Sequence, residues 1–155
     1  MPGIGLTTEH HGPMLRGFNP SIEVKSVLSE YPLMARLAAS DIGRAKTWYA
    51  DKLGLVPQTE EMGGQVLYYQ TGGQWFSVYQ TAFAGTARNT VAGWTVKDVE
   101  GLMAQLRARG VIFNDYDFGE VKTVNGLMAM GGYKAAWFTD SEGNTIELSQ
   151  VPEPG

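Results

Sequence analysis

The sequence predicts an α+β domain built from two tandem copies of a unit made of one strand, one helix and three further strands (βαβββ). Each half of the chain has a short apolar stretch followed by a residue that can cap a helix, Ser40 or Asp41 in the first half and Asp98 in the second. Each of these helices then ends at a glycine, Gly54 or Gly110. β-rich stretches separated by turn residues follow both helices. This internal repeat accounts for most of the 155 residues.

In the first half, the patterns predict a strand at 33–39, a helix over 41–54 and a three-stranded meander at 55–60, 65–73 and 74–81. The helix has Ala45, Trp48, Tyr49 and Leu53 on one face, and these residues are expected in the core.

In the second half, the same patterns predict a strand at 91–96, a helix over 98–110 and three strands at 111–117, 134–140 and 144–150. A glycine-containing loop, 115–132, is longer than a hairpin needs. It can be a lid over a cavity or an ordinary mobile loop, and the sequence does not separate these two interpretations.

Composition limits the classes of partner. The formal net charge of −4 leaves no surplus of Lys and Arg for nucleic-acid phosphates, so neither DNA nor RNA is expected as a partner. No apolar run reaches the ~18 residues of a membrane span. The absence of cysteine excludes disulfides and thiolate sites, and we expect a cytoplasmic protein. Residues 1–30 are predicted to be an irregular extension, 31–151 one domain and 152–155 a tail.

Glu147 is the first candidate functional residue, because it lies between Ile146 and Leu148 in an apolar strand where an unpaired carboxylate is costly. Strand alternation places Glu147 on one face with Thr145 and Ser149. Arg36, on the first strand, is its expected counter-ion. The pair can orient a ligand, Glu147 can move a proton, or the two can form a structural ion pair. Glu147 can also simply be hydrated at the end of a strand.

The repeat, together with the segment "AWFTDSEGNTIELSQ", resembles the glyoxalase, bleomycin-resistance and extradiol-dioxygenase superfamily, which has the vicinal oxygen chelate fold. The likeness runs from about Leu33 to Gln150. Its most specific part is Trp137, Phe138, Asp140, Gly143, Asn144 and Glu147, with Ser141 where the family usually has proline. The resemblance implies two units whose curved mixed sheet encloses a cavity, and chains that pair as homodimers. It does not fix the activity, because the same scaffold carries enzymes and drug-binding proteins.

The resemblance also implies where a metal would bind. The ligand positions of the family's metal enzymes fall near Met34, Ala92, Ser77 and Glu147. A thioether, a methyl group, a hydroxyl group and one carboxylate do not form a divalent-metal site. His10 and His11, the two histidines of the chain, lie in the extension. We therefore predict no metal ligand, no cofactor and a metal-independent protein.

Aromatic side chains are the second functional signal, because several lie on or near strands expected to form the cavity. The predicted ligand-binding residues are Arg36, Trp75, Ser77, Tyr79, Trp94, Tyr116, Trp137 and Glu147. Trp75, Trp94 and Trp137 can equally be core residues. The leading hypothesis is a protein that binds a small aromatic or hydrophobic metabolite or drug. The alternative is a metal-free isomerase, epimerase or lyase that acts on a carbonyl compound with Glu147 as acid or base.

Overall fold

The computed structural model describes residues 27–155. The chain divides into two parts, Met1–Pro32 and Leu33–Gly155. The predicted extension therefore falls mostly outside the described residues, as do His10 and His11. Within residues 27–32, the Tyr31 backbone N–H donates a hydrogen bond to the Leu28 carbonyl at 3.0 Å.

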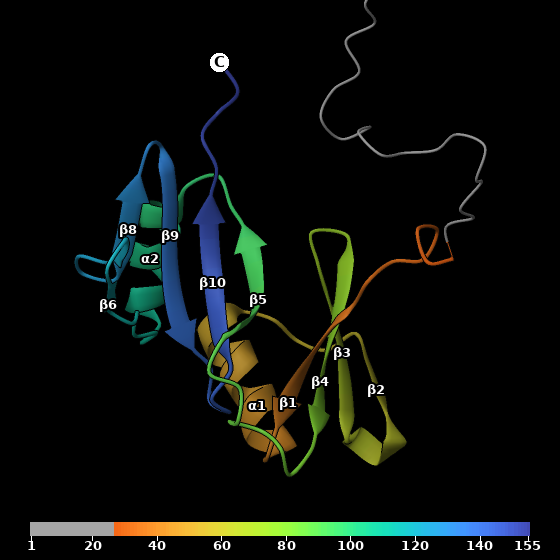
Figure 1. The fold of residues 1–155 in the computed structure, drawn as a ribbon. Helices are drawn as coiled ribbons and strands as arrows, with labels where there is room; N and C mark the ends of the chain where they lie inside the picture. Colours follow the sequence, from red (N-terminus) through yellow and green to blue (C-terminus); the bar gives the residue numbers. More distant parts are fainter. Residues whose placement is uncertain (1–26) are drawn as a thin grey trace, which may run out of the picture. The chain divides into compact units, whose positions relative to one another are not determined.

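Residues 33–155 contain two mixed four-stranded sheets, one from each βαβββ unit (Figure 1). The first sheet has the order β1-β4-β3-β2, and the second has the order β5-β10-β9-β8. The strands of the first sheet are β1 (Ala35–Ala39), β2 (Thr59–Glu61), β3 (Val66–Thr71) and β4 (Gln74–Gln80). Those of the second are β5 (Thr90–Thr95), β8 (Leu127–Met130), β9 (Tyr133–Thr139) and β10 (Thr145–Gln150). A separate two-stranded hairpin is formed by β6 (Asp117–Phe118) and β7 (Val121–Lys122).

Both predicted helices form at the predicted aspartates. Asp41 caps α1 (Ile42–Trp48) by accepting a hydrogen bond from Arg44 N–H, and Asp98 caps α2 (Val99–Ala108) by accepting one from Gly101 N–H. After Trp48 the first helix widens into a π-helical turn, η2 (Tyr49–Leu53), which ends at Gly54 in the left-handed region (φ 68°). Neither α1 nor α2, the α-helices of the described residues, is long and apolar enough to span a membrane.

The strand register confirms the internal repeat. In each sheet the strand before the helix pairs in parallel with the last strand of its unit: β1 with β4, and β5 with β10. Arg36 faces Ser77 in the first pair, and Gly93 faces Glu147 in the second. The predicted α+β architecture of two βαβββ units is therefore confirmed.

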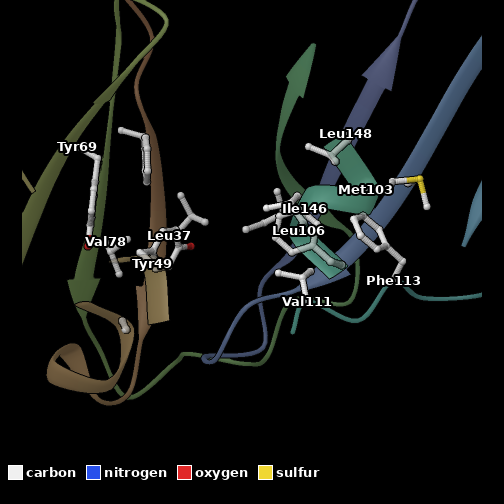
Figure 2. Close-up of a cluster of buried hydrophobic side chains, with 14 of the residues drawn as sticks. Leu37, Tyr49, Tyr69, Val78, Met103, Leu106, Val111, Phe113, Ile146 and Leu148 are labelled. Carbon is white, nitrogen blue, oxygen red and sulfur yellow. The ribbon is translucent and has the colours of Figure 1, made fainter. Parts of the chain in front are cut away.

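A hydrophobic core connects the helices to both sheets (Figure 2). In the first sheet Leu37 and Val78 are buried beside Tyr49 of the helical segment. In the second sheet Ile146 and Leu148 are buried with Leu106 of α2. The Trp48 ring stacks on that of Phe138 in β9, with 6.2 Å between ring centroids, so the first helix also contacts the second unit. Burial of such apolar surface is the main term that stabilises the fold.

Two element predictions are wrong in position. Residues 111–117 do not form the expected strand. The side chains of Val111 and Phe113 are buried in the core instead, and Phe113 makes only an isolated bridge to Phe138. The missing strand of the second unit is instead β8, inside the stretch predicted as a loop. Of the predicted strand 55–60, only its last two residues belong to β2. Pro57 explains the late start, since proline has no N–H to donate to a ladder.

Candidate functional site

Alternation along the strands gives each sheet a helix-side face and an opposite face, which we call the outer face. In the first sheet, Leu37 and Val78 lie on the helix side, while Arg36 and Ser77 lie on the outer face. In the second sheet, Ile146 and Leu148 lie on the helix side and Glu147 on the outer face. The predicted site residues therefore divide among three places.

The first place is a groove between the two sheets, which we call the inter-sheet groove. It has a volume of about 360 Å³, and three aromatic residues line it: Trp75, Phe76 and Trp94. The Phe76 and Trp94 rings meet edge to face, with centroids 6.1 Å apart and planes at 89°. The Trp94 Nε1–H donates a hydrogen bond to Thr71 Oγ1 at 3.2 Å, which joins β5 to β3.

Apart from Leu33 and Leu37, the rest of the groove lining is small or polar. Gly72, Ala92 and Gly93 leave room beside the rings. None of the residues that line the groove in the described part of the chain carries a charge. Trp75 and Trp94 were predicted for a ligand site, and the structure places both here. Phe76 was not predicted as a site residue, because in the sequence it is one of several apolar residues in a strand.

The second place is the outer face of the first sheet, which carries Arg36, Ser77 and Tyr79. Arg36 is exposed, and it lies beside Ser77 in the register of β1 and β4. Ser77 is fully buried, and its Oγ has no hydrogen-bond partner among the described residues. Tyr79 is 37% exposed.

The third place is the outer face of the second sheet, which carries Glu147 and Trp137 opposite each other in the register of β10 and β9. The Tyr133 hydroxyl donates a hydrogen bond to Glu147 Oε1 at 3.4 Å. Burial, followed by the nearby charge of Glu147, raises the pKa of Tyr133. The expected Arg36–Glu147 ion pair is not formed within residues 27–155, because the two side chains belong to different sheets.

Tyr116 packs edge to face on Trp137, with ring centroids 5.6 Å apart, at one end of this outer face. The segment that carries Tyr116 is held at its base. Asp115 Oδ1 accepts hydrogen bonds from the Gly126 N–H at 2.7 Å and from Thr123 Oγ1 at 2.8 Å. These two bonds, against a smaller opposing effect of burial, lower the pKa of Asp115. The stretch 115–132, predicted as a lid or an ordinary mobile loop, contains this hydrogen-bonded base, the β6–β7 hairpin and β8, and both interpretations of its motion stay predictions.

The donor set does not fit a divalent metal. The position predicted near Ala92 is one residue from the partner of Glu147 in the register, because Ala92 pairs with Ile146 and Gly93 pairs with Glu147. The outer-face positions related by the repeat are then Arg36, Ser77, Gly93 and Glu147, which offer a single carboxylate. No three or more His, Cys, Asp or Glu residues in the described part of the chain lie close enough to share an ion.

The turn between β9 and β10 contains the motif that carried the family resemblance. Asp140 is buried, and its Oδ2 accepts hydrogen bonds from the Tyr49 hydroxyl at 2.7 Å and from Asn144 Nδ2 at 2.8 Å. Asn144 Nδ2 also donates to the Ala38 carbonyl at 2.9 Å. We call these residues, together with Ser40, Asp41, Arg44, Ser141 and Glu142, the turn network. The network joins the second unit to β1 and to the helix of the first.

Glu142 and Arg44 form the ion pair of the turn network, and the sequence analysis predicted neither. Glu142 Oε2 accepts a hydrogen bond from Arg44 Nε at 2.8 Å, and Oε1 accepts one from the Asp41 N–H at 3.0 Å. Burial alone would raise the pKa of Glu142, but these hydrogen bonds, one from Ser141 Oγ and the Arg44 charge lower it to about 2. No spacing rule connects residues 98 positions apart.

Comparisons with known proteins agree with this architecture. A family model described as the Glyoxalase/Bleomycin resistance protein/Dioxygenase superfamily matches residues 32–148. None of the curated proteins compared with the sequence is a significant match.

Several solved structures share the fold at low identity. A glyoxalase/bleomycin resistance protein from Catenulispora Acidiphila DSM 44928 is 21% identical, with a TM-score of 0.59; the match covers 77% of this chain and 97% of that one. TnmS3, an antibiotic binding protein from Streptomyces sp. CB03234, is 22% identical, with a TM-score of 0.57 and coverage of 82% and 99%. The fosfomycin resistance protein FosX from Listeria monocytogenes, complexed with Mn(II) and sulfate, is 13% identical, with a TM-score of 0.58 and coverage of 80% and 91%. The family match spans most of the chain, and the chain therefore belongs to the glyoxalase/bleomycin resistance protein/dioxygenase superfamily.

Proposed function

We propose that the protein binds a small, flat, uncharged aromatic or hydrophobic molecule in the inter-sheet groove, without a metal ion. The observation that carries this proposal is the groove itself: about 360 Å³ of space walled by Trp75, Phe76 and Trp94. This volume lies within the range of about 300–1,000 Å³ that is common for small-molecule sites.

The chemistry of the lining selects the class of ligand. A charged ligand would lose hydration and find no counter-ion, since the lining in the described residues is uncharged. A flat ring system can instead stack on the exposed part of Trp75, which is 40% exposed. Thr71 and Gln74 offer hydrogen bonds to a carbonyl or hydroxyl group of the ligand. That TnmS3 is an antibiotic binding protein is consistent with a binding role on this fold.

Titration calorimetry with a neutral probe, 2-naphthamide, tests the proposal. Trp75→Ala should weaken binding by about tenfold, because only the exposed part of this ring can meet the ligand, and about 55 Å² of lost apolar contact corresponds to about 1.4 kcal/mol. Phe83→Ala is the control, because Phe83 is an exposed ring that is not part of the groove. If wild type does not bind neutral aromatics, or if Phe83→Ala weakens binding as much as Trp75→Ala does, the proposal is wrong.

The alternative of a metal-free enzyme has one supporting observation, the hydrogen bond from Tyr133 to Glu147. Glu147 does not line the inter-sheet groove. Glu147→Gln should therefore leave 2-naphthamide binding unchanged if the protein is a simple binding protein. If a carbonyl substrate is found whose turnover this substitution abolishes, the enzymatic role replaces the binding role.

We also propose that the protein is a homodimer. The edge strand β2 of the first sheet is exposed along its whole length, and within residues 27–155 one of its sides lacks a paired neighbour. A second copy that pairs with this edge would remove unpaired backbone groups from solvent and leave the inter-sheet groove open. Sedimentation analysis at micromolar concentration would measure a mass of about twice 16.9 kDa if this holds. A cytoplasmic location stays a prediction, for cell fractionation to check.

A further inference from the structure

A second hollow lies beneath the β6–β7 hairpin, at the end of the outer face of the second sheet. We call it the hairpin hollow. It has a volume of about 280 Å³ and is lined by three rings, those of Tyr116, Phe118 and Trp137. Its lining shares no residue with that of the inter-sheet groove. The two are therefore separate places on the molecule.

The three rings are arranged as an aromatic wall. Tyr116 meets Trp137 edge to face at 80°, and it also lies beside Phe118, with ring centroids 5.6 Å apart and planes at 31°. The Tyr116 hydroxyl accepts a hydrogen bond from Asn114 Nδ2 at 3.1 Å, which fixes the ring position. Phe118 is 73% exposed at the tip of the hairpin. Together with Tyr116, Val121 and Trp137, it gives the hollow a contiguous apolar wall that an apolar ligand can contact.

Arg88 distinguishes this hollow from the inter-sheet groove, because it is the one charged residue of the lining. Its side chain makes no ion pair or hydrogen bond with the described part of the chain, so the guanidinium is free to bind an anion. Thr90 and Thr145 add hydroxyl groups at the same end of the lining. A guanidinium presents parallel N–H donors that match a carboxylate.

We propose that the hairpin hollow is a second binding site, for an aromatic carboxylate. The ring of the ligand lies against Tyr116 and Phe118, and its carboxylate accepts hydrogen bonds from Arg88. The carboxylate of Glu147 lies two residues along β10 from Thr145 and does not line the hollow, so the anionic end is expected at Arg88. The net charge of −4 for the whole chain opposes general attraction of anions, which makes binding dependent on this local cation.

Titration calorimetry with 2-naphthoate on the full chain tests the second site. Arg88→Gln should weaken 2-naphthoate binding by about tenfold, as expected for loss of a charge-assisted hydrogen bond. Lys122→Gln is the matched control, since Lys122 is a cation of the same hairpin that does not line the hollow, and it should change the affinity by less than about twofold. Phe118→Ala, at an exposed position, should weaken binding by a further factor of about five.

The proposals for the two binding sites can be refuted independently of each other. Arg88→Gln should leave binding of 2-naphthamide in the inter-sheet groove unchanged, and Trp75→Ala should leave 2-naphthoate binding unchanged. The proposal of a second site is overturned if Lys122→Gln weakens 2-naphthoate binding as much as Arg88→Gln does. It is also overturned if Trp75→Ala, and not Phe118→Ala, removes the binding, or if wild type binds no 2-naphthoate.

Discussion

Replacement of Glu142 by glutamine should destabilise the fold in a way that depends on pH. The Glu142 side chain is fully buried and accepts hydrogen bonds from Arg44, Asp41 and Ser141. Its pKa falls from 4.5 to about 2. This difference of about 2.5, at about 1.36 kcal/mol for each unit of pKa, corresponds to about 3 kcal/mol of preferential stabilisation of the ionised form. Solvent screens part of the interaction because 53% of the Arg44 side chain is exposed, so we expect about 2 kcal/mol.

The direction of the pH effect follows from the lowered pKa. Above about pH 5 the carboxylate is ionised in both the folded and unfolded states, and its full contribution to the free energy of unfolding is present. As the pH falls from about 5 towards 2, the unfolded state takes up a proton first, and the contribution is lost. The glutamine variant has no such titration. The difference between wild type and Glu142→Gln should therefore be about 2 kcal/mol at pH 7 and shrink towards zero near pH 2.

Urea denaturation followed by tryptophan fluorescence, at pH values from 7 down to 2.5, measures this difference. Glu120→Gln is the control, because Glu120 is exposed and its side chain makes no hydrogen bond or ion pair with residues 27–155. It should change the unfolding free energy by less than about 0.5 kcal/mol at every pH. The reasoning is refuted if the wild-type and Glu142→Gln curves stay parallel between pH 5 and pH 2.5.

Three further substitutions test other parts of the fold by thermal or urea unfolding at pH 7. Tyr49→Phe removes the 2.7 Å hydrogen bond to Asp140 and should cost about 1.5–3 kcal/mol, since the acceptor is a buried carboxylate; an unchanged midpoint would mean that water replaces the hydroxyl group. Gly93→Ala would place a methyl group 3.1 Å from the Glu147 carbonyl oxygen and 3.4 Å from its Cβ, and should cost about 1–3 kcal/mol; no loss would show that β5 can shift away from β10. Ser77→Ala removes a buried hydroxyl that has no partner in the described residues and should be neutral or stabilising by up to about 1 kcal/mol; a clear loss would reveal a hydrogen bond to water.

The fold could be predicted from the sequence largely because its signals are local. Asp41 and Gly54 bound the first helix through capping and a left-handed turn, which depend on a few neighbouring residues. The misplaced strand at 111–117 shows the limit of such signals. Val111 and Phe113 have strand-like chemistry, but the Phe113 side chain packs against Phe138, and β8 takes the ladder position instead. Tertiary packing overrides propensity in this segment.

The candidate site could be predicted only in part, because the arrangement of the two sheets determines which residues meet. Alternation correctly places Arg36 and Glu147 on outer faces, but it cannot tell that these faces belong to separate sheets of one chain. An error of one residue in β5 moves a side chain to the opposite face, which is why Ala92 was expected beside Glu147 where Gly93 lies. Arg88 gave no signal in the sequence, since a lone cation before a strand is common on protein surfaces.

The turn network explains why the motif at the end of the chain predicts the fold and not the ligand. Both carboxylate oxygens of Asp140 accept two hydrogen bonds each, and they come from Tyr49, Glu142 and Asn144. The Asn144 amide also donates a hydrogen bond to the Ala38 carbonyl. These polar atoms therefore hold the two βαβββ units together and are not available to bind a ligand. Loss of such a buried bond costs stability, whereas a change at Trp75 or Arg88 leaves these bonds in place. Specificity for a ligand can therefore vary among chains that share this turn, which is what a fold with many activities requires.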